Sequence, residues 1–244
     1  MYLHAGNIHH SADIIVRKMK SSGTIALYCL DQDPRRGSSI GIFNYTRNLI
    51  VALSKLENPG FTIELWLSST NASFLLPPSL PSWMEPVILR GTFCSGARRL
   101  FADHMLAPLL EMLHSATAAH YPKGWLPVIK LSGTKRIATI HDTIVHFLAK
   151  HYRHYRTGLK NRYFGVLSRF SIGNSWAILS DSTFTASGIG VLDQKATEKI
   201  TVHPLGPGIH FEANRHSTVR DQILVIGSLV PYKFTAAILS LLSG

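Results

Sequence analysis

Residues 24–53 have the sequence TIALYCLDQDPRRGSSIGIFNYTRNLIVAL, and this stretch decides the class of fold. It begins with a short apolar run, Thr24–Leu30, which has the length of a buried strand and ends at the turn-forming residues 31–34. After the glycine-containing loop 37–41, apolar residues recur at helical spacing as far as Leu53. The stretch therefore predicts a strand, a glycine loop and a helix, the unit from which parallel α/β sheets are built.

The rest of the chain repeats this alternation of strands and helices. Further apolar runs of strand length lie at 61–67, 86–89, 135–140, 177–179 and 200–202, and helical patterns lie near 97–114 and within 152–170. Segments rich in Ser, Pro or Gly predict loops at 68–81 and 121–127. Such an alternation favours a doubly wound, mostly parallel sheet with right-handed crossovers.

The composition is that of a packed globular protein. Of the 244 residues, 45% are hydrophobic and 16% are charged, which is not the balance of a disordered or low-complexity chain. The length allows one large α/β domain, or one domain and the start of another. The two cysteines, Cys29 and Cys94, have no metal-ligand spacing. The sequence therefore predicts no metal site and no disulfide framework, and it favours a reducing, cytoplasmic setting.

Two segments bear on membrane contact. Residues 1–22 lack the continuous apolar core of a signal peptide and are predicted to be a loose leader. No window reaches about 18 uninterrupted apolar residues, so a spanning helix is not predicted and any membrane contact would be peripheral. The basic, tyrosine-containing stretch 150–169 suits contact with the anionic inner face of a cell membrane. A cleft-facing or core helix whose Lys and Arg stems cover apolar surface explains the same pattern.

The chain carries a strong excess of positive charge. Lys and Arg number 25 against 14 Asp and Glu, which gives a formal charge of +11. Such a surface attracts phosphate groups in nucleic acid, anionic lipid or a sugar diphosphate, although an ordinary solvated basic face is the alternative. Because the sequence lacks a helix-turn-helix and an RNP motif, no nucleic-acid partner is predicted. The glycine spacing at 37–41 differs from GxGxxG, which disfavours NAD, and no cofactor is predicted.

The last part of the sequence predicts the start of a second domain. An apolar strand at 223–227 leads into Gly-Ser-Leu-Val-Pro-Tyr-Lys, and an apolar helix follows at 235–242. One strand and one helix cannot form a core of their own. The expected organisation is a leader at 1–22, a domain at 23–218 and the start of a truncated domain at 219–244.

Four segments of the sequence carry a family resemblance. They are 41–49 (GIFNYTRNL), 140–144 (IHDTI) with 152–155 (YRHY) and 160–163 (KNRY), 178–185 (ILSDSTFT), and 223–233 (ILVIGSLVPYK). Together they resemble glycosyltransferase family 4, whose members build bacterial polysaccharides. The resemblance implies a GT-B architecture of two Rossmann-like domains facing a cleft, with this chain holding the N-terminal, acceptor-side domain.

The resemblance also implies an activity. This is retaining transfer of a sugar, with mannose as one candidate, from a GDP- or UDP-sugar to a saccharide or lipid-linked acceptor in polysaccharide or lipopolysaccharide biosynthesis. The alternative is a non-catalytic, acceptor-binding half that needs a separate donor domain. The family's donor-domain motif of two glutamates separated by seven residues is absent from this sequence.

His141 and Asp142 are the predicted catalytic residues. They directly follow the predicted strand 135–140, where a doubly wound sheet places its ligands. An imidazole at this position can hydrogen-bond a sugar, and Asp142 can fix its tautomer or orient an acceptor hydroxyl. A structural cap is the alternative for such a pair. The family resemblance implies the catalytic role.

The resemblance implies substrate contacts from Gly41 and Tyr45 in the first segment, Ser182 in the third, and Gly227 and Lys233 in the fourth. A glycine before the first helix permits close approach of a ligand to the helix N-terminus, although a tight turn needing positive φ is the alternative. Ser182 lies where the sequence also resembles a helix N-cap. Lys233 matches the basic residue that binds the diphosphate in the family's donor domain.

Overall fold

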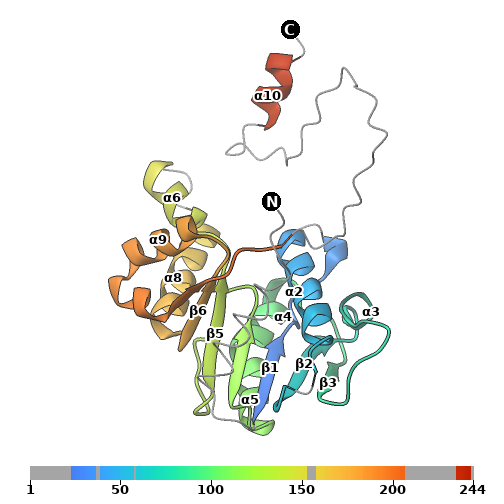
Figure 1. The fold of residues 1–244 in the computed structure, drawn as a ribbon. Coiled ribbons are helices and arrows are strands. Elements are labelled where there is room, and N and C mark those ends of the chain that lie inside the picture. Colours follow the sequence, from blue (N-terminus) through green and yellow to red (C-terminus); the bar gives the residue numbers. More distant parts are fainter. Residues whose placement is uncertain (1–22, 37–38, 58, 153–157, 207–234, 243–244) are drawn as a thin grey trace. The chain divides into compact units, whose positions relative to one another are not determined.

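The fold is built on one parallel sheet (Figure 1). The computed structural model of the protein describes residues 23–36, 39–57, 59–152, 158–206 and 235–242. The strands are β1 (Thr24–Tyr28), β2 (Thr62–Ser68), β3 (Met84–Leu89), β4 (Ala118–Tyr121), β5 (Lys135–Ile140), β6 (Ala177–Ser180) and β7 (Ile200–Val202). Their spatial order is β3-β2-β1-β4-β5-β6-β7, and every neighbouring pair is parallel. The predicted α/β class with a doubly wound, Rossmann-like sheet is confirmed.

Helices connect the strands. The α-helices are α2 (Ile40–Leu53), α3 (Ala72–Leu75), α4 (Gly96–Phe101), α5 (Ala107–Leu113), α6 (Ile144–His151), α8 (Leu159–Asn174), α9 (Thr183–Leu192) and α10 (Thr235–Leu242). Short turns of other helical types are η1 (Pro34–Arg36), η2 (Ala102–Leu106) and η3 (Gln194–Lys199). Figure 1 shows α2 lying against the sheet near β1, in the position that the pattern of residues 24–53 predicts.

The order of the strands creates a switch point between β1 and β4. The chain leaves β1 through α2 to β2 on one side, and it returns from β3 through α4 and α5 to β4 on the other side of β1. The loops that follow β1 and β4 therefore diverge at the carboxyl edge of the sheet. This divergence forms the crevice in which open α/β sheets bind ligands.

Strand β1 is buried on both faces. Tyr28 belongs to one core cluster with Leu110 of α5, whereas Leu27 belongs to the opposite cluster with Ile50 of α2. Because successive side chains of a strand point to opposite faces, an uninterrupted apolar run places apolar groups in both cores. The apolar run that predicted this strand thus reflects helices on both sides of the sheet.

Two departures from the predicted elements concern the segments 97–114 and 68–81. The predicted helix 97–114 is divided into α4 and α5 by the π-helical turn η2. Pro108 lies in the first turn of α5 and has no backbone N–H to donate to the preceding turn, which favours an interruption there. Helix α3 lies inside the predicted loop 68–81, but it has only four residues.

A third departure is the strand β4, which the sequence did not predict. Its residues, Ala-Ala-His-Tyr, include none of the β-branched side chains that mark a strand in a sequence. It forms because β1 and β5 lie on either side and pair with it. Helix α6 was likewise not predicted, since the helical pattern was placed from residue 152 onward.

A buried ion pair fastens the helix α5 to the sheet. Arg136 of β5 donates to both carboxylate oxygens of Glu111, with Nε–Oε1 and Nη2–Oε2 distances of 2.8 Å. Tyr121 OH also donates to Glu111, at 2.7 Å. Two further Arg136 N–H groups donate to the carbonyl oxygens of Pro127 and Ile129, at 2.8 and 2.6 Å. Every nitrogen of the guanidinium and both oxygens of the carboxylate are thus hydrogen-bonded, as burial of charge requires.

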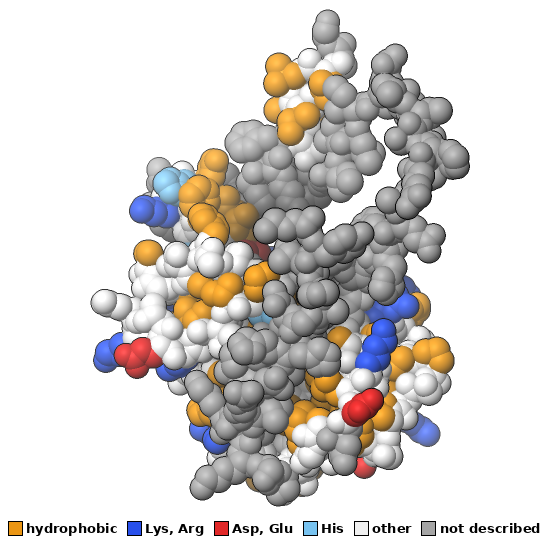
Figure 2. Space-filling view, in the orientation of Figure 1, with side chains coloured by type: hydrophobic (Ala, Val, Ile, Leu, Met, Phe, Trp, Pro, Cys, Tyr) orange, Lys and Arg blue, Asp and Glu red, His pale blue; other side chains and the backbone are white. Residues whose placement is uncertain are grey.

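The chain divides into two units, Met1–Gly208 and Ile209–Gly244. The sheet lies in the first, and α10 is the described part of the second. Figure 2 shows hydrophobic side chains exposed on α10, of which Leu241 is 82% exposed. None of the described helices is both long enough and apolar enough to cross a membrane. The predicted leader 1–22, the boundary at 218–219 and the strand 223–227 lie outside the described residues.

Replacing Glu111 with Gln tests the ion pair. The substitution leaves the buried guanidinium of Arg136 without its charge partner, so we expect a loss of about 3–5 kcal/mol in the free energy of unfolding, measured by urea denaturation. Arg35→Gln is the control, since it removes an exposed guanidinium from its ion pair with Asp33 and should change stability far less. Equal losses in the two variants would contradict this account.

Candidate functional site

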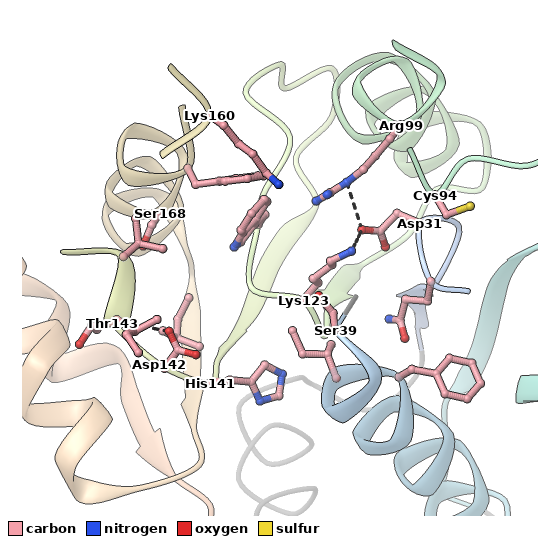
Figure 3. Close-up of a pocket in the computed structure, with 18 of the residues that line it drawn as sticks. Asp31, Ser39, Cys94, Arg99, Lys123, His141, Asp142, Thr143, Lys160 and Ser168 are labelled. Carbon is pink, nitrogen blue, oxygen red and sulfur yellow. Dashed lines mark hydrogen bonds and ion pairs between the residues drawn. The ribbon is translucent and has the colours of Figure 1, made fainter. Parts of the chain in front are cut away.

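A cavity of about 340 Å³ opens at the carboxyl ends of β1, β4 and β5 (Figure 3). Its wall is formed by residues 31–33 after β1, by Lys123 and Trp125 after β4, and by residues 140–146 at the end of β5. Side chains from α2, α4 and α8 complete it. The cavity therefore lies beside the switch point of the sheet, where the strand order predicts a ligand.

Two buried polar side chains in the wall of this cavity have atoms without a hydrogen-bond partner. Asp31 and Gln32 are each 4% exposed. Oδ1 of Asp31 and both amide atoms of Gln32 have no hydrogen-bond partner among the described residues. The backbone here is fixed by Asn71, whose Nδ2 donates to the carbonyl oxygens of Cys29 and Gln32 at 2.7 and 2.6 Å. Since an unpaired buried polar atom costs about 1–3 kcal/mol, these atoms suit a polar ligand.

Gly124 fixes the position of the loop after β4. Its φ is +78°, and a Cβ atom at this residue would lie 2.5 Å from the carbonyl oxygen of Thr139 in β5. Only glycine combines this backbone conformation with so close an approach to the strand. The flanking residues Lys123 and Trp125 are thereby held in the cavity wall.

Opposite charges meet on the side of the cavity near α4. Oδ2 of Asp31 lies 2.9 Å from Lys123 Nζ and 3.5 Å from Arg99 Nε. Arg99 Nε also donates to Asp103 Oδ2 at 3.1 Å, and Tyr28 OH donates to Asp103 Oδ1 at 2.7 Å. Burial, and then the charge of Asp31, raise the pKa of Asp103 to about 7 against the attraction of Arg99. Near neutral pH, Asp103 is therefore only partly ionised.

His141 is held by two hydrogen-bond acceptors. Its Nδ1 lies 2.5 Å from Asp181 Oδ2, and its Nε2 lies 2.8 Å from the carbonyl oxygen of Pro122. Both bonds form together when both ring nitrogens carry a hydrogen. Asp181, and not Asp142, is thus the carboxylate that orients His141. Asp142 is exposed, and its Oδ1 accepts the backbone N–H of Ile144 at 3.0 Å.

A neutral hydrogen-bonded layer lies behind His141. The Tyr45 ring packs edge-on against the imidazole, at 4.9 Å between centroids. Tyr45 OH lies 3.2 Å from Thr139 Oγ1, which lies 2.8 Å from His120 Nε2. Burial raises the pKa of Tyr45 to about 12, while burial and then His141 lower the pKa of His120 to about 3. Both groups are therefore neutral near pH 7, and the layer supports His141 without adding charge.

The other predicted site residues are placed as follows. Gly41 is the second residue of α2 and has open space where a side chain would be, whereas the positive φ of this turn belongs to Ser39. A need for positive φ therefore does not explain Gly41. Ser182 caps α9 by accepting the Thr185 N–H at 3.1 Å. Tyr45 supports His141, and Gly227 and Lys233 lie outside the described residues.

Sequence reasoning missed several residues of the cavity. They are Asp31, Gln32, Arg99, Lys123 and Lys160. The local signals were a polar turn, Asp31–Pro34, which follows the first strand at the edge where ligands bind, and the segment 160–163, which begins with Lys160. Nothing in the spacing of the sequence links that turn to the three basic residues.

Comparison with known proteins does not identify a family. No protein-family model matches the chain, and no curated protein matches it. In the described part of the chain, no three His, Cys, Asp or Glu side chains form a group that could hold a metal ion. The cavity offers a ligand carboxylates, an amide, cations and aromatic rings.

Thr139→Val tests the layer behind His141. Valine keeps the shape of the side chain but removes the hydroxyl that bonds Tyr45 and His120, so we expect the free energy of unfolding to fall by about 1–3 kcal/mol. Thr139→Ser is the control because it keeps the hydroxyl and loses only a methyl group. A serine variant as unstable as the valine variant in urea denaturation would show that packing, and not hydrogen bonding, dominates here.

Asp103→Asn tests the raised pKa of Asp103. The folded state holds this proton to about pH 7, whereas an unfolded aspartate releases it near pH 4, so wild-type stability falls as the pH rises between these values. Relative to the Asn variant, we expect the wild type to lose about 1–3 kcal/mol of unfolding free energy from pH 5 to 7. Denaturation curves at several pH values measure this difference. Parallel pH profiles would mean that Asp103 is already ionised at pH 5.

Proposed function

We propose that this chain is the acceptor-side part of a retaining glycosyltransferase. The transferred sugar, with mannose as a candidate, would pass from a GDP- or UDP-sugar to a hydroxyl of a saccharide or lipid-linked acceptor in polysaccharide biosynthesis. The observation that carries the proposal is the cavity beside the switch point, with Oδ1 of Asp31 and the amide of Gln32 unpartnered in its wall. Sugar hydroxyls donate and accept hydrogen bonds, so they suit a carboxylate oxygen and an amide.

Aromatic rings in the cavity support a sugar ligand. Trp125 and Phe164 both line it, and their ring centroids lie 4.1 Å apart. Ring faces of this kind offer apolar surface to the C–H side of a sugar, while the polar residues receive its hydroxyls. The cavity thus combines the two kinds of surface that a saccharide presents.

His141 suits a positioning role in transfer. Transfer requires that the groups around the acceptor be held in a fixed geometry. Asp181 and the Pro122 carbonyl occupy both ring nitrogens and hold the imidazole in place. Neither nitrogen is then left to take a proton from the acceptor. We assign the orientation of the acceptor hydroxyl to Asp142, an exposed carboxylate in the same wall.

A second candidate function is acceptor binding without transfer, by a half that depends on a separate donor domain. The observation that favours it is that all the residues lining the cavity lie between Asp31 and Ser168, within the first unit of the chain. Acceptor binding by these residues does not require the segment with Gly227 and Lys233.

We place the protein at the cytoplasmic side of the cell membrane, in peripheral contact with it. Nucleotide sugars and a lipid-linked acceptor would meet there. The basic stretch predicted for such a contact includes the start of α8, where Arg162 is exposed. Anionic lipid attracts exposed basic side chains of this kind.

A transfer assay tests the proposed function. The purified chain is incubated with GDP- and UDP-sugars and a mixed extract of lipid-linked acceptors, and the release of nucleotide diphosphate and the labelled product are measured. We expect turnover with one donor, and a rate about a hundredfold lower in His141→Ala, because the ring that joins the loop after β4 to Asp181 in the cavity wall is removed. His151→Ala is the control, since His151 is exposed and does not line the cavity.

The outcomes separate the two candidate functions. Turnover that is lost in His141→Ala and kept in His151→Ala supports the transferase. No turnover, together with saccharide binding that Gln32→Ala weakens, supports the binding half. Neither turnover nor saccharide binding would refute both.

A further inference from the structure

Three cations of the cavity lie near one another. Figure 3 shows Arg99 from α4, Lys160 from α8 and Lys123 from the loop after β4 reaching toward the same space. Arg99 and Lys123 contact the same oxygen of Asp31, at 3.5 and 2.9 Å. Arg99 and Lys160 lie over the same ring, that of Phe164, each 6.0 Å from its centroid. A shared carboxylate and a shared ring thus bring the three cations together.

Positive charge is in excess at this place. One carboxylate, Asp31, is shared by two cations. The other carboxyl group in contact with Arg99 is Asp103, which burial and Asp31 keep only partly ionised near neutral pH. Lys160 forms no ion pair with any residue that the structure describes. Among the direct contacts of Arg99, Lys123 and Lys160, basic groups therefore outnumber ionised carboxylates, while Asp33 and Asp142 lie elsewhere in the cavity wall.

The guanidinium of Arg99 has donors to spare. Its Nε faces Asp31 and Asp103, while its two Nη groups donate to none of the described side chains or carbonyls. The Trp125 ring lies 5.0 Å from Cζ and lines the same cavity. Two parallel N–H groups on a planar cation match the oxygens of a phosphate or carboxylate.

We infer that Arg99, Lys123 and Lys160 form a subsite for an oxyanion, a phosphate or carboxylate group, on the ligand that the cavity binds. A second feature of the same cavity also indicates a ligand, because Gln32 is buried there with both amide atoms unpartnered. This assignment rests on the proposed function, because it takes the anionic group to be part of the saccharide acceptor. It specifies that acceptor as an acidic sugar or a sugar phosphate.

Calorimetric titration of the full chain tests the subsite. The probes are glucose, glucose 6-phosphate, glucuronate and inorganic phosphate at low salt. We expect an anionic sugar to bind about tenfold or more tightly than glucose, with inorganic phosphate competing, since hydrogen bonds between charged groups are stronger than those to a neutral hydroxyl. The tighter of the two anionic sugars identifies the group as phosphate or carboxylate.

Two variants and two matched controls locate the effect. Arg99→Gln and Lys160→Gln should each raise the Kd of the anionic sugar about tenfold and leave that of glucose unchanged. Arg98→Gln and Arg162→Gln remove the same charge from exposed neighbours that do not line the cavity. Lys160 is exposed, so its variant remains informative even if Arg99→Gln fails to fold.

Each result of the titrations either supports or refutes the oxyanion subsite. If the control variants weaken binding as much as the cavity variants, the attraction comes from the overall charge of +11 and the subsite is refuted. Equal affinity for glucose and both anionic sugars also refutes it, while leaving the proposed function intact. Anion binding that depends on Arg99 and Lys160 supports the subsite even if no transfer is detected. Absence of binding by every probe would overturn the subsite and saccharide binding together.

Discussion

The buried ion pair between Glu111 and Arg136 is the interaction on which the candidate site depends. It joins α5 to β5, binds Tyr121 at the end of β4, and holds the loop after β4 through two carbonyl oxygens. If these segments separated, each charge would lose its partner. The cost of an unpaired buried charge therefore keeps the segments together. The same loop supplies Lys123 and Trp125 to the cavity, so the position of cavity groups follows from a contact outside the cavity.

His141 extends this constraint across the sheet. Its nitrogens join the loop after β4, through the Pro122 carbonyl, to Asp181 at the end of β6. Its ring rests on Tyr45 of α2, whose hydroxyl bonds back to β5 at Thr139. One imidazole thus connects elements on both sides of the switch point. A wall so connected is preformed, and a preformed wall spares a ligand part of the entropy cost of ordering it.

The parts of the fold that could be predicted from sequence are those that local patterns determine. The apolar run Thr24–Leu30 and the helical spacing after it specify their elements without reference to the rest of the chain, and His141 was located because it directly follows a strand. The partner of His141 could not be found in this way. Asp142 is adjacent in sequence but accepts the N–H of Ile144 at the start of α6, whereas Asp181 is adjacent in space because β5 and β6 pair. The cluster of Asp31 with Lys123 and Arg99 depends in the same way on β1 pairing with β4.

The basic side chains attract an anion most strongly where they are shielded from water. Charges exposed on the surface are screened by salt, whereas Arg99 and Lys123 keep their side chains largely out of water and act on the cavity with less screening. Asp103 determines how much of that charge is available, because burial and Asp31 oppose its ionisation while Arg99 favours it. An oxyanion placed beside Arg99 would oppose that ionisation further. By linkage, binding of the anion and protonation of Asp103 then favour each other, and the carboxyl group adjusts the cavity to the charge of its ligand.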